Sequence, residues 1–345
     1  AKTTSKIVHT EGEMNTSAAR QSWQAGAVGP KSKPLLQRDT DAFLHQSLST
    51  PCASTIAKAE GIWIEDLDGR RYMDFHGNSV HHLGYGHPDV VAAIKDQLDS
   101  LSFAPRRFTN DISVTLAEKL GSLAPGDLSK VLFTTGGSDA VEVALKIARA
   151  ATGRFKTVSF WDAFHGAGFG ASSVGGEATF RSQIAGPLLA GAEHVAPFDC
   201  YRCPYGHNGP DVCGLACANM VRYVLEREGD VAAVIAEPMR AVPYVPPVGF
   251  WKAVRQACDD AGALLIFDEI PTGLGKTGKF FACEHDDVVP DIVVMDIVMP
   301  DLNGMESALR ITSEYPDVKV IGLSMHSERQ FVVGMLTSGA SGYLL

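Results

Sequence analysis

The chain has 345 residues, of which 45% are hydrophobic and 20% are charged, which is enough for two globular domains with sizeable cores. Its formal net charge of −10 argues against a nucleic-acid surface, which needs clustered Lys and Arg. No apolar run approaches the roughly 20 residues of a membrane span. Residues 1–13 contain no apolar signal core, so we expect a cytoplasmic protein without membrane contacts.

The N-terminal region is polar and weakly periodic. We interpret residues 1–50 as an arm that ends in a first helix, around residues 41–48. Residues 62–74 then read as a hairpin that turns at Asp68 and Gly69, a dipeptide that suits a tight hairpin loop.

Beyond the hairpin, short apolar runs alternate with helical stripes. The helical stripes lie at residues 138–151 and 250–260. Four apolar runs without polar alternation predict strands buried on both faces of a mainly parallel sheet: 131–135, 157–160, 231–236 and 263–267. Strands that alternate with helices predict an α/β, doubly wound fold for a large domain over residues 51–294.

Ligands of such sheets bind at the carboxyl ends of the strands. Gly137 and Ser138 follow the first predicted strand, and their amides and hydroxyl suit a phosphate group, although the same residues also make an ordinary capped turn. Phe164 follows the second strand, where it could stack on a planar ring or pack in the core. Asp268 and Glu269 end the fourth strand, where a protonated pyridine nitrogen or a nearby Lys or Arg would balance the charge.

In this order, the motifs resemble class III aminotransferases, which are fold type I enzymes that use pyridoxal phosphate (PLP). The resemblance covers about residues 15–294. It rests on Thr-Gly-Gly-Ser-Asp-Ala-Val-Glu at 135–142, Phe-His-Gly at 164–166, Ala-Glu-Pro at 236–238 and Asp-Glu-Ile-Pro-Thr-Gly-Leu-Gly-Lys-Thr-Gly at 268–278. These segments imply a transaminase-type enzyme with PLP as its cofactor.

The resemblance also implies residue roles. Asp268 pairs with the ring nitrogen, and Glu237 orders the site near the phenolic edge of the ring. The other implied contacts are to the phosphate from Gly137 and Ser138, and to the ring from the segment that contains Phe164 and His165.

One family residue is replaced. The Schiff-base lysine of the family falls on Ile297, and isoleucine has no amine. We therefore expect catalysis to be lost and any PLP to bind without a covalent bond.

Substrate clues come from four residues and one departure. His76 and Asn78 lie in an unusually polar segment, and the adjacent Arg106 and Arg107 suit a doubly charged acidic group. Pro271 stands where the family usually has Gln. With residues 201–206, these features resemble a subgroup that includes ammonia-lyases of hydroxylated aminoethylphosphonates.

Other readings of these residues stay open. ω-Amino-acid transaminases are the competing comparison, and the arginines and histidines could instead be surface or packing residues. In either case, the resemblance implies a small-molecule amine or amino acid as ligand and a homodimer as assembly.

From about residue 291, the chain resembles the second half of a response-regulator receiver, which has a flavodoxin-like fold. Residues 293–306, 319–326 and 339–345 carry the resemblance. It implies that Asp296 is a phosphoacceptor and that Ser324 senses the phosphoryl group. Two alternatives to an inactive PLP protein follow: a signalling protein phosphorylated by a histidine kinase, and a chimeric product joined at residues 290–294.

Four of the seven cysteines cluster in one loop, at Cys200, Cys203, Cys213 and Cys217. A Cys-x2-Cys pair matches the ligand spacing of structural zinc and iron–sulfur sites. The two spacings differ, however, and the loop is rich in Pro and Gly, so idle cysteines are the alternative. We assign no metal on the sequence alone.

Overall fold

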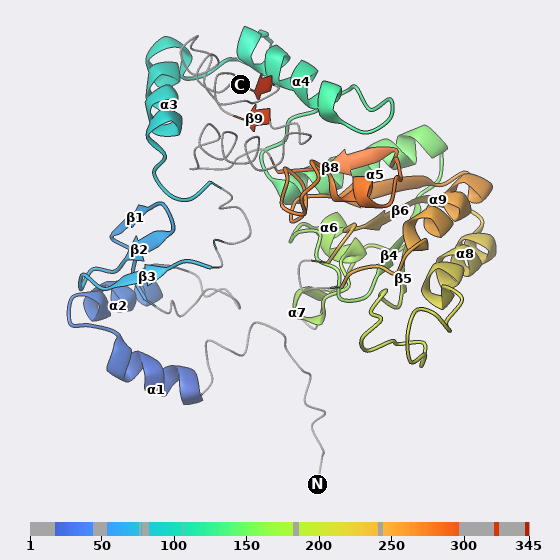
Figure 1. The fold of residues 1–345 in the computed structure, drawn as a ribbon, viewed down its shortest axis with the longest axis horizontal. Coiled ribbons are helices and arrows are strands. Elements are labelled where there is room, and N and C mark those ends of the chain that lie inside the picture. Colours follow the sequence, from blue (N-terminus) through green and yellow to red (C-terminus); the bar gives the residue numbers. More distant parts are fainter. Residues whose placement is uncertain are drawn as a thin grey trace. The chain divides into compact units, whose positions relative to one another are not determined.

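The computed structural model describes residues 18–43, 54–75, 77, 83–105, 107–181, 186–240, 244–296, 321–323 and 342–344. The chain divides into two compact units (Figure 1). One comprises Ala1–Ile112 with Met299–Leu345, and the other comprises Ser113–Val298. The candidate site described below lies wholly within the second unit.

The first unit contains a small antiparallel sheet, in the order β1-β2-β3. The predicted hairpin is confirmed, because β2 and β3 pair antiparallel and the Gly69 amide donates to the Asp66 carbonyl oxygen at 3.0 Å. The elements of this unit are α1 (Ala18–Ala27), α2 (Ser32–Ala42), β1 (Lys58–Glu60), β2 (Trp63–Glu65), β3 (Arg71–Met73), α3 (Pro88–Leu101), β9 (Ile321–Leu323) and β10 (Gly342–Leu344). β9 and β10 pair in parallel.

Helices α1 and α2 both begin before the first helix that we predicted around residues 41–48, and most of that predicted range lies outside the described residues. α2 starts nine residues earlier and ends at Ala42, and residues 44–50 lie outside the described part of the chain. The physical reason is a distant cap. The Asp68 carboxylate accepts hydrogen bonds from the Lys31 amide at 2.9 Å, the Ser32 amide at 3.1 Å and the Ser32 hydroxyl at 2.6 Å. These donors sit where α2 starts, and no local sequence pattern reveals that contact.

The second unit is built on a five-stranded parallel sheet in the order β5-β4-β6-β7-β8. Its strands are β4 (Lys156–Phe160), β5 (Ala192–Val195), β6 (Val231–Ala236), β7 (Leu264–Asp268) and β8 (Ile292–Val294). All six residues of β6 are buried. The prediction of parallel strands covered on both faces is therefore confirmed for β4, β6 and β7.

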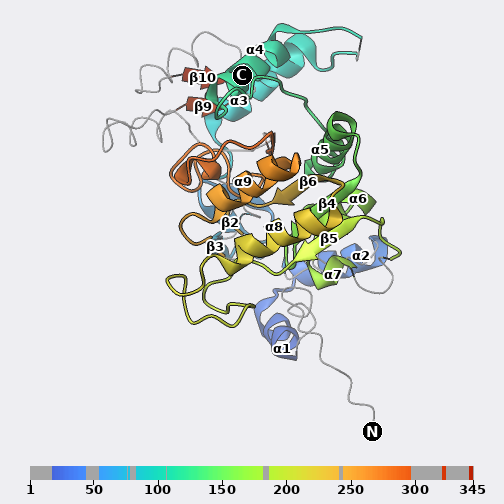
Figure 2. The same cartoon turned by 90° about the vertical axis from the view of Figure 1, so that its right-hand side faces the viewer.

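Helices cover both faces of this sheet (Figures 1 and 2). α8 (Ala216–Glu228) and α9 (Phe250–Ala261) pack together on one face, over a core rich in aromatic rings around Trp251. α5 (Gly137–Thr152) and α6 (Phe169–Val174) pack on the other face, over aliphatic residues. α4 (Asp111–Leu123), α7 (Ala178–Arg181) and the short η4 (Ala282–His285) complete the unit.

The predicted strand at residues 131–135 is wrong. The segment forms no strand ahead of α5, and it leaves Leu132 and Phe133 exposed. A strand needs a neighbouring strand for its backbone hydrogen bonds. Among the described strands, the sheet ends at β8, which pairs only with β7 and not with residues 131–135. An apolar run alone does not supply that neighbour.

Across the described residues, we find no helix both long and apolar enough to traverse a bilayer.

Candidate active site

The polar residues predicted at the strand ends do meet at one edge of the sheet. β4 leads into Phe164 and His165, β6 leads into Glu237, and β7 ends at Asp268. Parallel neighbouring strands bring these carboxyl ends together, and hydrogen bonds join the segments that follow them.

Asp268 and His165 form the buried centre of the site. The His165 Nδ1 atom lies 2.8 Å from the Asp268 Oδ2 atom, and both side chains are almost completely buried. The other carboxylate oxygen of Asp268 accepts the Ile270 amide at 3.1 Å. On the far side of the imidazole ring, the buried His165 Nε2 atom has no hydrogen-bond partner among the described residues. A buried polar atom without a partner is costly, so this ring stands where a further polar group would stabilise it.

A second buried charged pair fixes the segment that carries Phe164. Glu237 accepts the Phe164 amide at 3.1 Å and the Arg240 guanidinium at 3.0 Å through the same carboxylate oxygen. Arg240 is 11% exposed, and Glu177 lies 4.0 Å away on its other side. Glu237 therefore positions the backbone at Phe164 while Arg240 balances its charge.

The Phe164 ring is 40% exposed and lies 4.6 Å from the ring of Phe180, centroid to centroid. An aromatic ring that keeps one part in solvent at a strand end is available to stack on a planar ligand.

The loop after β4 packs closely on the start of α5. The Ala167 amide donates to the Ser138 hydroxyl at 3.1 Å. Gly166 has a φ of 120°, and a Cβ atom added there would lie 2.4 Å from the Ser138 oxygen. Ile270 approaches Gly137 in the same way, because its Cδ1 atom would lie 2.8 Å from a Cβ at Gly137. Glycine is thus required at Gly166, where φ is positive and the Ser138 backbone is close, whereas at Gly137 the Ile270 side chain could move aside.

Two neighbouring carboxylates at the end of β7 have different surroundings. Glu269 is completely buried and accepts three hydrogen bonds, from the Thr272 hydroxyl at 2.5 Å, the Ala282 amide at 3.0 Å and the Cys283 amide at 2.9 Å. Burial raises the pKa of Glu269, and these three donors oppose the rise. The sequence led us to expect a positive partner for both carboxylates, but Glu269 is satisfied by neutral donors.

The local arrangement fits PLP. The free amides at the start of α5 suit its phosphate, Phe164 suits the face of its ring, and the buried Asp268 suits its protonated ring nitrogen. Gly166 packs closely on Ser138, and the buried His165 Nε2 atom, which lacks a partner within the described residues, would be stabilised by a polar group. When bound, PLP supplies an electron-withdrawing ring.

Five predicted site residues lie outside the described part of the chain: His76, Asn78, Arg106, Ile297 and Ser324. Arg107 is exposed and belongs to the first unit. Asp296 is half-buried beyond β8. The substrate and phosphoacceptor roles of these residues stay predictions.

Sequence reasoning missed two partnerships. Arg240 lies three positions beyond Glu237, a spacing that could have suggested the ion pair. The pairing of His165 with Asp268 spans 103 positions, and no local pattern signals it.

Comparison with known proteins identifies the class. The family model for class-III aminotransferases matches residues 45–309. The chain belongs to this family, whose members depend on PLP.

The chain is 46% identical over 297 residues to an (R)-1-hydroxy-2-aminoethylphosphonate ammonia-lyase from Vibrio splendidus, covering 82% of this chain and 62% of that protein. It is 39% identical over 244 residues to an acetylornithine aminotransferase from Methanopyrus kandleri, covering 70% of this chain and 57% of that protein. The chain thus spans about three fifths of the length of these relatives.

Solved structures show the same fold. An (S)-enantioselective ω-transaminase from Thermomicrobium roseum superposes with a TM-score of 0.71 at 31% identity, over 76% of this chain and 62% of that one. A taurine:2-oxoglutarate aminotransferase from Bifidobacterium kashiwanohense superposes with a TM-score of 0.71 at 27% identity, over 89% and 72%. The predicted PLP-transferase-like α/β fold is confirmed.

Proposed function

We propose that this chain binds PLP without a covalent bond, in a site descended from an enzyme that acts on an amino-phosphonate or an amino acid. The observation that carries the proposal is the buried pair of Asp268 and His165 at the end of the parallel sheet. That carboxylate suits the protonated ring nitrogen of PLP, and Gly137 and Ser138 lie at the helix start that suits its phosphate.

The proposed substrate class follows the relative from Vibrio splendidus, whose name describes an ammonia-lyase of hydroxylated aminoethylphosphonate. Pro271, where the family usually has Gln, and the paired Arg106 and Arg107 support the same class, because two arginines suit a dianionic phosphonate. Transaminases such as the relative from Methanopyrus kandleri are the alternative ancestry. A homodimer is the assembly we expect.

Loss of turnover is the second part of the proposal. Ile297 stands at the position of the family's lysine, so this chain holds no amine there. Lys276 is the amine that could replace the lost lysine. Its Nζ atom donates to the carbonyl oxygen of Ile270 at 3.3 Å, and Ile270 follows Asp268 by two positions. Burial lowers the pKa of Lys276.

A PLP titration followed by borohydride reduction and peptide mapping tests the proposal. We expect saturable absorbance changes and no reduced adduct in the natural chain, and an adduct at position 297 in the Ile297→Lys variant. No saturable binding would refute the proposal. An adduct at Lys276 would instead show that a neighbouring amine has replaced the lost one, and ammonia release from the hydroxylated aminoethylphosphonate would then be assayed.

A receiver-type function is the second candidate. The parallel pairing of β9 with β10 supports it, since both strands fall within the segments that resemble a receiver. This candidate predicts Mg²⁺-dependent labelling of Asp296 by a small phosphodonor such as acetyl phosphate. Absence of labelling in the natural chain, measured against the Asp296→Asn variant, would remove it.

A further inference from the structure

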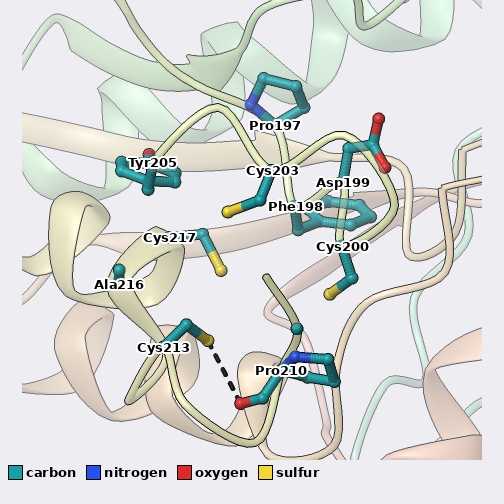
Figure 3. A pocket seen from close by; sticks show the side chains of 11 residues that line it. Pro197, Phe198, Asp199, Cys200, Cys203, Tyr205, Pro210, Cys213, Ala216 and Cys217 are labelled. Atoms are coloured by element: carbon teal, nitrogen blue, oxygen red, sulfur yellow. Dashed lines mark hydrogen bonds between the residues drawn. The ribbon is translucent and has the colours of Figure 1, made fainter. Parts of the chain in front are cut away.

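The loop between β5 and α8, with the start of α8, gathers four cysteines around one small cavity that none of the residues assigned to the PLP site lines. Cys200, Cys203, Cys213 and Cys217 all line this cavity, together with Phe198 and other residues of the same loop. Figure 3 shows the four side chains turned toward the space between the loop and the start of α8. The sequence places these cysteines up to 17 positions apart, and the fold brings them together.

The backbone that carries the first two cysteines is ordered by its own hydrogen bonds. The Asp199 carboxylate accepts the Tyr201 amide at 2.9 Å and the Arg202 amide at 3.0 Å. The Gly206 amide then closes a turn onto the Cys203 carbonyl oxygen at 3.0 Å. The Cys-x2-Cys pair is therefore held on a tight turn, as a pair of ligands for one ion requires.

The other two cysteines flank the start of α8. The Ala216 amide donates to the Cys213 carbonyl oxygen at 3.1 Å, and Cys217 is the second residue of the helix. The ligand set thus combines a turn with a helix start.

The four sulfur atoms influence one another. Burial raises the pKa of Cys217 to about 11, and Cys213 and Cys200 add to the rise. Burial also raises the pKa of Cys200, with further contributions from Cys213 and Cys203. The Cys213 thiol also donates a hydrogen bond to the Pro210 carbonyl oxygen at 3.3 Å.

We propose that Cys200, Cys203, Cys213 and Cys217 bind one zinc ion as a structural tetrathiolate site. Soft sulfur ligands favour zinc over magnesium or calcium. Binding converts four thiols to thiolates, forms four Zn–S bonds and releases four protons to solvent. The ion thereby ties the loop after β5 to the start of α8.

Binding requires the sulfurs to draw closer. Within the described residues, no three His, Cys, Asp or Glu side chains are already grouped so as to hold a metal ion. In the proposed site, the Cys213 thiol gives up its hydrogen bond to the Pro210 carbonyl oxygen and turns toward the other sulfurs once it loses its proton. Gly206, Gly209 and Gly214 leave the loop room to contract, since nothing lies within 4 Å of a Cβ built on any of them.

Cobalt titration of the full chain, reduced with a phosphine, tests the site. We expect saturation at one equivalent, with the sulfur-to-cobalt charge-transfer and intense visible bands of a tetrahedral tetrathiolate, and displacement by one equivalent of zinc. The Cys203→Ser and Cys217→Ser variants should lose these bands or weaken zinc binding at least 100-fold. The matched control is Cys258→Ala, at a buried cysteine of α9 outside the cavity, which should keep both.

Metal binding to the natural chain by itself can refute the proposal, so the test does not depend on whether the variants fold. Seven free thiols counted with Ellman's reagent in the denatured chain, together with no saturable cobalt or zinc binding before denaturation, would refute the site. Bands that persist in both serine variants would refute this ligand set. Because the site uses no residue of the PLP site, these outcomes are independent of the PLP titration.

Discussion

The end of β7 places two buried carboxylates side by side in the sequence, and their surroundings differ. Asp268 meets a histidine whose far nitrogen has no hydrogen-bond partner in the described part of the chain, whereas Glu269 is enclosed by a hydroxyl and two backbone amides. A carboxylate satisfied by neutral local donors holds a loop in place. A buried carboxylate beside a ring nitrogen that still needs a polar partner is suited to a ligand.

The largest effect should come from the structural carboxylate. Glu269→Ala leaves the Ala282 and Cys283 amides and the Thr272 hydroxyl without an acceptor in a buried site. We expect the free energy of unfolding to fall by about 3 kcal/mol, measured by urea denaturation. The comparison fails if this variant is as stable as the natural chain.

The next effect concerns the pair of Asp268 and His165 in the chain without PLP. His165→Phe leaves the Asp268 Oδ2 atom buried and unpaired. We expect a destabilisation of about 2 kcal/mol that is largely absent when the same change is made in the Asp268→Asn background. Additive effects in the double-mutant cycle would show that the two side chains are not coupled.

Phosphate recognition should have a smaller, selective effect. Ser138→Ala removes one hydroxyl at the start of α5, which is worth about 1 kcal/mol, or roughly fivefold in the dissociation constant of PLP. Pyridoxal, which has the ring without the phosphate, serves as the control ligand. Equal losses for both ligands would place Ser138 away from the phosphate.

The smallest effect is a dependence on pH. The pKa of Glu269 is raised in the folded chain, so its contribution to stability is fully present below its usual value of 4.5 and is lost as the pH rises through the folded value. The stability of the natural chain relative to Glu269→Gln should therefore decline from pH 4.5 toward neutrality. Urea denaturation of both chains at several pH values measures this stability difference. A stability advantage of the natural chain that grows with pH would contradict the raised pKa of Glu269.

The sequence predicted the centre of the fold better than its edges. β6 is an uninterrupted apolar run, and β7 is apolar up to Asp268. β4 is mixed in composition, but four of its five residues are buried like those of its neighbours. Residues 131–135 form a similar run but no strand, because a strand also depends on a neighbour that a local pattern does not specify.

The candidate site shows the same limit. The identities of Phe164, Glu237 and Asp268 followed from their positions at strand ends. Their partners did not, because His165 and Asp268 pair across 103 positions and Glu269 finds its donors in the segment around η4. These long-range partners distinguish the structural carboxylate from the ligand-binding one, and only the three-dimensional structure reveals them.

The most direct measurement is a PLP titration of the natural chain, Asp268→Asn and Glu269→Gln, followed by absorbance and corrected for the folded fraction of each. The account predicts saturable binding to the natural chain, at least tenfold weaker binding to Asp268→Asn, and unchanged affinity for Glu269→Gln, because only Asp268 belongs to the ligand site. Equal affinities for the natural chain and Asp268→Asn, or no saturable binding to any of them, would contradict it.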